Sequence, residues 1–322
     1  MNSEKSETVD QTEATPEPAV RGGQVVGVDG SEGSGHALEW AVNHIPVFGA
    51  VQPIVAWQYP WWGMGTGLAA DPLPPPPEDF AAAARATAER ALESYAQPGV
   101  SPAIVCRSNA GPALVEFGAG ADLVVVGTRG HGAIAGAVLG SISSHVVGHS
   151  RTPVAVIPID APTDCIAERA GAKIVVGLDG SENSIAALAW AITTLPASTS
   201  ILAVHSYTIN VGAAPELVTL PIEAFETQAQ ATLDFSIDKA VSLAGGTAPA
   251  NLETKLAFGD PRSILRDHAE DASMLVLGAR GHRGIAHLLL GSVTTGLVHH
   301  PNTVTIVVPA TGEGASDGAE QP

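Results

Sequence analysis

The chain is organised around a stretch that reads Leu123-Val124-Val125-Val126-Gly127-Thr128-Arg129-Gly130 and continues, after nine further residues, to Gly140-Ser141. Its apolar run is rich in β-branched residues, which is typical of a buried strand. A glycine-rich turn between a strand and a helix can hold phosphate, because residues without a Cβ let backbone N–H groups face an anion and a helix N-terminus favours negative charge. The stretch therefore predicts a strand, a phosphate-binding loop and a helix.

The same arrangement occurs again about 150 residues later. A second apolar run, 274–277, precedes Gly278-Ala279-Arg280-Gly281, and Gly291-Ser292 follows after nine residues. An Asp-Gly-Ser-Glu sequence follows another apolar run in each half, at 29–32 and 179–182. The matched order of these motifs indicates an internal duplication.

Composition sets the outer bounds. A length of 322 residues is typical of about two domains. The net charge of −18 argues against nucleic acid or an anionic membrane as a partner, so any phosphate site has to be local. Two cysteines cannot form a disulfide framework, and no run approaches the length of a membrane span. We therefore expect a soluble, cytoplasmic protein.

The predicted organisation has five parts. Residues 1–22 form a disordered acidic tail, 23–158 a first domain, 159–172 a linker, 173–309 a second domain and 310–322 a disordered tail. Expected strands in the first half are 25–29, 51–57, 103–107, 123–126 and 154–157. Their counterparts are 174–178, 201–205, 252–258, 274–277 and 304–308. Helical patterns separate these strands.

The Trp- and Pro-rich loop 59–79 interrupts the first half and is long for a compact domain. A lid, a partner surface, a disordered excursion and a tolerated insertion whose tryptophans pack on the domain's own surface all fit this loop. The sequence leaves these four interpretations open.

Alternating strands and helices predict an α/β fold with two tandem, doubly wound, five-stranded parallel sheets of Rossmann-like type. Ligands of such sheets lie beyond the carboxyl ends of the strands, where the strand order reverses. Asp29 closes the first strand and Gly127 closes the fourth, so the two reach one crevice if those strands are neighbours. Asp179 and Gly278 would form a second crevice of the same kind.

The spacing Gly, two residues, Gly, nine residues, Gly and then Ser resembles the ATP-binding branch of the universal stress protein family, whose domains are similar to adenine nucleotide alpha hydrolases. The resemblance covers both halves except the tails and the loop 59–79. A tandem pair of such domains is similar to the dormancy-associated stress proteins of mycobacteria and other actinobacteria. The resemblance of both halves to this family implies up to two ATP molecules per chain, with Mg²⁺ as a candidate counter-ion.

Site residues follow from the resemblance, position by position. Asp29 and Asp179 would approach the ribose, with Gly27 and Gly177 beside the base. The backbone of Ala56 and Ser206 would face the adenine. The triphosphate would be held in the first half by Gly127, Thr128, Arg129, Gly130, His131, Gly132, Gly140, Ser141 and Ile142. The corresponding positions in the second half are Gly278, Ala279, Arg280, Gly281, His282, Gly291, Ser292 and Val293.

Simpler roles remain open for several of these residues. Glycines can serve only to turn the chain, Asp29 can be a turn or cap residue, and exposed loop arginines such as Arg129 and Arg280 are often merely solvated. The histidines at 145, 149, 299 and 300 follow no shared metal-ligand pattern, so we predict no metal site in the protein itself.

The pattern favours ATP binding over catalysis, since it contains no Walker lysine and no evident base for attack on a γ-phosphate. We therefore expect a regulatory nucleotide sensor in stress or dormancy adaptation, with slow hydrolysis at most. Two alternatives are an ATP hydrolase or adenylyl-transferring enzyme and a flavin-binding electron carrier. Protein partners cannot be read from the sequence.

The last strand of each half is apolar and would lie at a sheet edge, where an unpaired backbone can add another strand. Because members of this family pair through that edge, the two halves are expected to pack as an internal pseudo-dimer. A homodimer of whole chains is expected in addition.

Overall fold

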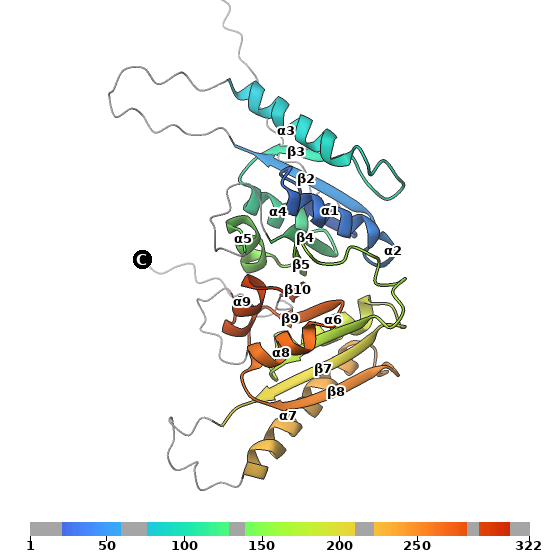
Figure 1. The fold of residues 1–322 in the computed structure, drawn as a ribbon, viewed down its shortest axis with the longest axis vertical. Helices are drawn as coiled ribbons and strands as arrows, with labels where there is room; N and C mark the ends of the chain where they lie inside the picture. The colour runs from blue at the N-terminus through green and yellow to red at the C-terminus, as the bar shows by residue number, and fades with distance from the viewer. Residues whose placement is uncertain (1–20, 59–75, 129–138, 210–221, 282–289, 310–322) are drawn as a thin grey trace, which may run out of the picture.

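A computed structural model describes residues 21–58, 76–128, 139–209, 222–281 and 290–309 (Figure 1). The C-terminal tail, most of the N-terminal tail and the loop 59–79 as far as residue 75 lie outside the described residues. The part that is described contains both halves of the duplication and the linker between them.

Strands and helices alternate in the first half as the hydrophobic pattern predicts. Their order is β1 (Gln24–Gly27), α1 (Glu32–Asn43), α2 (Ile45–Phe48), β2 (Val51–Trp57), α3 (Pro77–Leu92), β3 (Ile104–Arg107), α4 (Ala110–Gly118), β4 (Leu123–Gly127), α5 (Ser141–His149) and β5 (Val154–Ile157).

The second half repeats this order without a counterpart of α2. Its order is β6 (Lys173–Leu178), α6 (Glu182–Thr194), β7 (Ser200–Tyr207), α7 (Ile222–Leu243), β8 (Leu252–Phe258), α8 (Pro261–Ala269), β9 (Met274–Gly278), α9 (Ser292–His299) and β10 (Val304–Val308).

Helix α1 is shorter than its apolar spacing suggests. Ile45 continues the helical pattern of the sequence, yet α1 ends at Asn43 and Ile45 begins the four-residue helix α2. Pro46 accounts for the break, because proline has no N–H to donate and its ring collides with the preceding turn of a helix. Phe48 is thereby carried toward the second half, where its ring stacks on Trp190 with centroids 6.2 Å apart.

All ten strands form one sheet in the order β3-β2-β1-β4-β5-β10-β9-β6-β7-β8. Within each half the strands are parallel, and the order reverses between the first and fourth strands, which are neighbours. The condition set for a shared crevice is therefore met. Figure 1 shows the halves stacked along the long axis, with β5 and β10 in the middle. The doubly wound fold is confirmed.

The halves join through β5 and β10, which pair antiparallel with Ile306 opposite Ala155. This pairing confirms the predicted internal pseudo-dimer. It satisfies the backbone groups along both strands that would otherwise be exposed edges. The outer edges of the sheet are β3 and β8.

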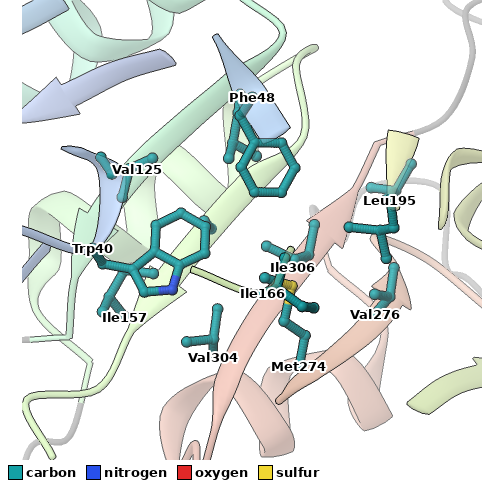
Figure 2. Close-up of a cluster of buried hydrophobic side chains, with 14 of the residues drawn as sticks. Trp40, Phe48, Val125, Ile157, Ile166, Leu195, Met274, Val276, Val304 and Ile306 are labelled. Carbon is teal, nitrogen blue, oxygen red and sulfur yellow. The ribbon is translucent and has the colours of Figure 1, made fainter. Parts of the chain in front are cut away.

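Apolar side chains fill both faces of the sheet. One continuous core lies under α1, α2, α3, α6 and α7 and crosses from one half to the other. Figure 2 shows its centre, where Trp40, Phe48 and Ile166 gather beside residues of β9 and β10. Helices α4 and α5 cover the opposite face of the first half, and α8 and α9 cover that face of the second.

Candidate functional site

The strand order brings the two sequence motifs of each half to one edge of the sheet. Val26 lies opposite Val125 where β1 pairs with β4, and Val176 lies opposite Val276 where β6 pairs with β9. Because these strands are parallel, Asp29 and Gly127 follow at the same carboxyl edge, as Asp179 and Gly278 do in the second half.

The aspartate of each motif organises the turn that follows it. Asp29 Oδ1 accepts hydrogen bonds from the backbone N–H of Ser31 at 2.9 Å and from the Ser31 hydroxyl at 2.5 Å. Ser31 in turn caps α1 by accepting from the N–H of Ser34 at 3.2 Å. Gly30 has φ +80°, a conformation that L side chains rarely adopt. The turn and cap roles considered for this motif are therefore present in the structure.

The same turn forms in the second half with one difference. Asp179 Oδ1 accepts from the Ser181 N–H at 3.0 Å, but the Ser181 hydroxyl donates to the carbonyl of Arg280 at 3.3 Å. The first-strand turn and the glycine loop are thus in direct contact. The backbone of Gly281 also passes close to the Asp179 carboxylate, since a Cβ on Gly281 would overlap it.

The first glycine of each loop is required by helix packing. A Cβ on Gly127 would lie 2.5 Å from the carbonyl oxygen of Gly33, in the first turn of α1. A Cβ on Gly278 would lie 2.6 Å from the carbonyl carbon of Asn183 in α6. Contacts this short with backbone atoms cannot relax by rotating a side chain. These two glycines are explained without any ligand.

Gly27 and Gly177 also have a packing explanation. A Cβ on Gly27 would lie 2.8 Å from Leu114 Cδ1 of α4, and one on Gly177 would lie 3.0 Å from Leu265 Cδ1 of α8. Both glycines therefore let a leucine of the covering helix lie directly on the strand. Their predicted place beside a base remains a prediction.

Gly140 differs from these glycines because the protein leaves room for a side chain there. Its φ of −67° and ψ of 159° suit any residue. A Cβ would meet only the Thr128 oxygen at 3.6 Å and the Ser143 hydroxyl at 3.9 Å, which are ordinary contact distances. Among the described residues nothing requires glycine at this position. A small residue here keeps the start of α5 accessible.

The loops end at helix N-termini that are built alike. In the part of the chain that the structure describes, no side chain caps α5 or α9. Ser143 donates its hydroxyl to the Gly127 carbonyl at 2.7 Å, and Thr294 donates to the Gly278 carbonyl at 2.8 Å. These buried bonds fix each helix start against the end of its strand. The first-turn N–H groups and the helix dipole together favour an anion at this end.

Side chains at the helix starts are accessible in both halves. Ser141 and Ser292, the first residues of α5 and α9, are exposed. Ile142 is 39% exposed and Val293 is half-buried. The two hydroxyls can therefore reach a ligand at the end of each loop.

The backbone N–H groups of Thr128 and Ala279 are already hydrogen-bonded within the protein, although both residues belong to the predicted loops. Both are buried. Thr128 donates its N–H to Ile157 at 3.1 Å, and Ala279 donates to Val308 at 2.8 Å. The two N–H groups thus extend the sheet.

The predicted adenine positions lie at the carboxyl ends of β2 and β7. Ala56 lies opposite Cys106 and Ser206 opposite Ala257, and both are half-buried. Next to Ser206, the buried His205 bonds through Nδ1 to the Leu178 carbonyl at 2.8 Å. Sequence reasoning missed this histidine. Comparison of the two halves could have found it, because the first half has valine at the matching position 55.

Part of the predicted site cannot be placed. Arg129, Gly130, His131, Gly132 and His282 lie outside the described residues. Arg280 is described and is exposed at the start of the second loop. The contacts of these arginines and histidines with the triphosphate therefore remain predictions.

Other features of the described residues do not coincide with these two sites. A surface hollow of about 480 Å³ lies between the halves beside Phe48, Arg151 and Trp190. No group of three His, Cys, Asp or Glu residues is arranged to hold a metal ion in the described ranges. No described helix is both long and apolar enough to cross a membrane.

Comparison with known proteins gives a consistent match over the chain. A family model described as the universal stress protein family matches residues 25–158 and again residues 172–309. A universal stress protein of Mycobacterium tuberculosis is 31% identical over 312 residues, which cover 90% of this chain and 98% of that protein. A second protein of that name from the same species is 29% identical and covers 88% of this chain and 95% of its own length.

A solved structure supports the fold. The crystal structure of a universal stress protein from Archaeoglobus fulgidus superposes with a TM-score of 0.59 at 16% identity, covering 89% of this chain and 98% of that chain. At this identity the likeness concerns the fold alone. Two tandem domains of one family are thus established for the chain.

Proposed function

The chain belongs to the universal stress protein family, and from this premise we propose that it binds ATP at two sites and acts as a regulatory nucleotide sensor in stress or dormancy adaptation. One observation carries the proposal. In each half a helix N-terminus that no described side chain caps, preceded by glycine and beginning with an exposed serine, lies at the switch point of a parallel sheet.

The local charge of the site explains how an acidic protein can hold a triphosphate. The chain carries −18, so long-range attraction works against ATP. Helix N-termini act over the first turn only and provide anion-binding N–H groups at short range. Gly140 supports this role because, among the described residues, only ordinary contact distances surround the place where a side chain would stand.

The position of Asp179 favours a metal ion with the nucleotide. Its carboxylate lies against Gly281 in the second loop, where a phosphate oxygen would otherwise meet negative charge. Mg²⁺ is bound in proteins by one or two carboxylates together with substrate phosphates. We therefore infer that ATP binds as its magnesium complex, in which the ion is held by the phosphates and Asp29 and Asp179, expected near the ribose, are the carboxylates that reach it.

Nothing in the described part of the site adds a catalytic base to this cradle. The polar groups at the loop ends are hydroxyls, and the aspartates already hold their own turns. Binding that stabilises one conformation shifts the population by its differential affinity, which is sufficient for a sensor. We propose hydrolysis that is slow at most.

The cellular setting of the protein is part of the same proposal. We propose a cytoplasmic protein that forms a homodimer of whole chains. Because β5 and β10 already pair with each other, a homodimer has to use another surface, such as an outer edge of the sheet.

The test is to count the nucleotide that each chain binds. Protein purified without added nucleotide is denatured, and the released compounds are identified by mass spectrometry and quantified by chromatography. Calorimetric titration with Mg-ATP then gives the number of sites, and Asp29→Ala and Asp179→Ala should each remove one. Failure to find ATP in the preparation, together with a flat titration, would refute the proposal.

A further inference from the structure

The linker 159–172 is bound along one face of α1. His36 Nε2 bonds to the carbonyl of Ala161 at 2.7 Å. Further along the helix, the Asn43 amide donates to the carbonyl of Thr163 at 3.1 Å. The Thr163 hydroxyl donates to the carboxylate of Glu39 at 2.8 Å. The linker is therefore held along the length of the helix.

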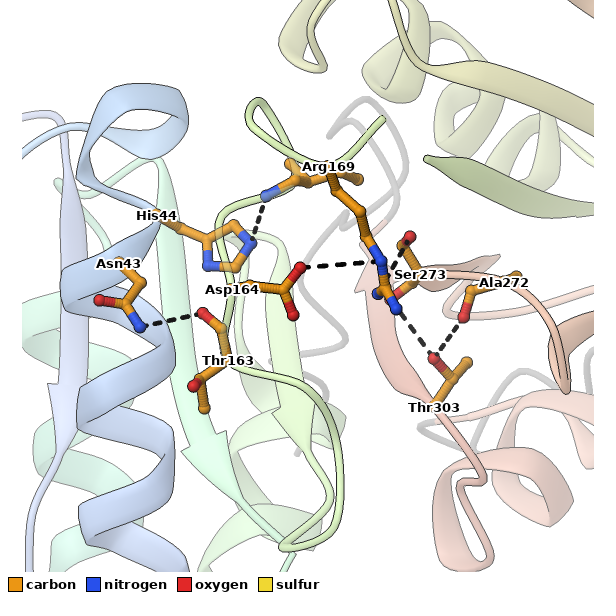
Figure 3. Close-up of polar contacts among 9 residues, drawn as sticks. Asn43, His44, Thr163, Asp164, Arg169, Ala272, Ser273 and Thr303 are labelled. Carbon is orange, nitrogen blue, oxygen red and sulfur yellow. Dashed lines mark hydrogen bonds and ion pairs between the residues drawn. The ribbon is translucent and has the colours of Figure 1, made fainter. Parts of the chain in front are cut away.

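His44 makes the last of these contacts, just beyond the end of α1 (Figure 3). Its Nδ1 bonds to the Trp40 carbonyl at 2.8 Å, and its Nε2 accepts the N–H of Ile166 at 3.2 Å. The Trp40 carbonyl needs a donor and the Ile166 N–H needs an acceptor. The imidazole is therefore neutral, with its proton on Nδ1.

These contacts are not part of the duplicated fold. The residues of α6 that match His36, Glu39, Asn43 and His44 are Ala186, Ala189, Thr193 and Thr194. None of the four polar groups recurs. The polar side chains that bind the linker therefore occur in the first repeat and not at the matching positions of the second.

The far end of the linker is anchored in the junction between the halves. Ile166 is 2% exposed and belongs to the core that contains Trp40 and residues of β9 and β10. Arg169 donates to the hydroxyl of Ser273, in front of β9, at 3.5 Å. The linker therefore contacts both halves before it enters β6.

The near end of the linker begins at the first predicted nucleotide site. Ile157, the last residue of β5, accepts the N–H of Thr128, which follows β4 at the start of the first glycine loop. The same helix that holds the linker packs its first turn against Gly127. A displacement of α1 or of this loop on ligand binding would thus act directly on the linker.

We infer that the linker is a strap that couples occupancy of the first nucleotide site, and not the second, to the packing of the junction between the halves. This inference rests on the proposed function, because it assigns a regulatory output to one of the proposed ATP sites. The two sites then differ in role despite their matched motifs. The positions of α6 that match the strap contacts of α1 carry alanine and threonine, so the second site lacks this set of contacts.

Cys165 provides a reporter within the strap. It is 5% exposed and is one of the two cysteines of the chain. In a Cys106→Ser background, the rate at which a maleimide labels Cys165 measures how often the strap opens. This measurement can be made with and without Mg-ATP on the full chain.

The first arm tests, without nucleotide, the contacts between the strap and α1. His36→Ala and Asn43→Ala should each speed labelling of Cys165 about fivefold, the effect of losing one hydrogen bond. Thr193→Ala, at the position in α6 that matches Asn43, is the control and should leave the rate unchanged. Equal rates in all of these variants would show that α1 does not hold the strap.

The second arm tests the coupling. Saturating Mg-ATP should slow labelling about fivefold or more, the lower range of allosteric coupling. The effect should persist in Asp179→Ala and disappear in Asp29→Ala. If calorimetry shows ATP bound at both sites while labelling is unaffected, the coupling is wrong and the proposed function stands. If neither site binds ATP, both proposals are wrong, whatever the first arm shows.

Discussion

Replacing Gly140 by alanine separates a glycine that serves a ligand from a glycine that serves packing. Gly127, in the same loop, is the matched comparison. Gly140 has ordinary backbone angles and room for a methyl group, whereas a Cβ on Gly127 would lie 2.5 Å from the Gly33 oxygen. The two substitutions are chemically identical, so a difference between them reflects the surroundings alone.

Their effects on stability can be worked out from these surroundings. For Gly140→Ala, reduced freedom of the unfolded chain stabilises by about 0.4–1 kcal/mol, and the poorer N-cap costs up to about 1 kcal/mol. The net change is therefore close to zero. For Gly127→Ala, α1 has to move away from β4, and overpacking of this kind costs about 1–3 kcal/mol.

Nucleotide binding should show the opposite order of effects. A methyl group on Gly140 occupies space next to the first N–H groups of α5, and we expect at least a tenfold weaker affinity at the first site, which is about 1.4 kcal/mol. Any effect of Gly127→Ala on ATP should follow from its loss of stability.

Urea denaturation measures the stability of both variants, and calorimetric titration with Mg-ATP measures their affinity. An Asp179→Ala background leaves only the first site to be titrated. If Gly140→Ala binds ATP as tightly as the parent protein and is equally stable, the glycine at the helix start has no role toward the ligand. The reasoning from free space at Gly140 would then be refuted.

Three further predictions concern acid stability, the junction and the metal ion. Burial lowers the pKa of His44 from 6.5 to about 4, with bonding to Trp40 and the charge of Asp164 opposing part of the shift. The free energy of unfolding is therefore unaffected by His44 above about pH 6.5 and falls by about 3 kcal/mol in total as the pH falls toward 4, because the unfolded chain takes up the proton first. His44→Gln should make the free energy of unfolding less dependent on pH in denaturation curves recorded across that range. Ile306→Asp places a charge at a residue with no exposed surface and should lower the free energy of unfolding by about 4 kcal/mol or more. Val156→Asp should have the same effect. An unchanged melting temperature and hydrodynamic radius would contradict the assignment of the β5–β10 junction. Chelation of Mg²⁺ with EDTA should weaken ATP binding about tenfold or more in titrations, and an affinity independent of the metal would argue against carboxylate-bound magnesium.

Much of the fold could be predicted because its signals are local. The apolar runs of β5 and β10 have the predicted bounds, 154–157 and 304–308, and a helix follows each glycine motif as expected, with α5 beginning at Ser141 and α9 at Ser292. The expected place of the ligand, conditional on β1 and β4 being neighbours, followed from the general topology of doubly wound sheets. The duplication added weight, since each motif could be checked against its copy.

The site was predicted less completely, because the role of a glycine depends on atoms that are distant in the sequence. Gly127 and Gly140 belong to one motif, yet a Cβ on the first would overlap the backbone of α1, whereas a Cβ on the second would make only ordinary contacts with the described residues. Nothing in the spacing distinguishes them. Thr128 was likewise expected to hold the triphosphate, although its N–H continues the sheet by donating to the carbonyl of Ile157.

The linker shows the same limit more clearly. Its sequence indicates only a connection between domains, but His44 and Ile166, which are 122 positions apart, meet through a hydrogen bond at the junction. The sequence by itself determined two α/β domains of one family with a glycine and serine loop at the same place in each, because strand period, helix period and motif spacing are encoded by residues close together. Only the tertiary structure decided which glycines are needed for packing, how the halves join into one sheet and that the linker lies along α1, because each of these depends on which distant surfaces meet when the core closes.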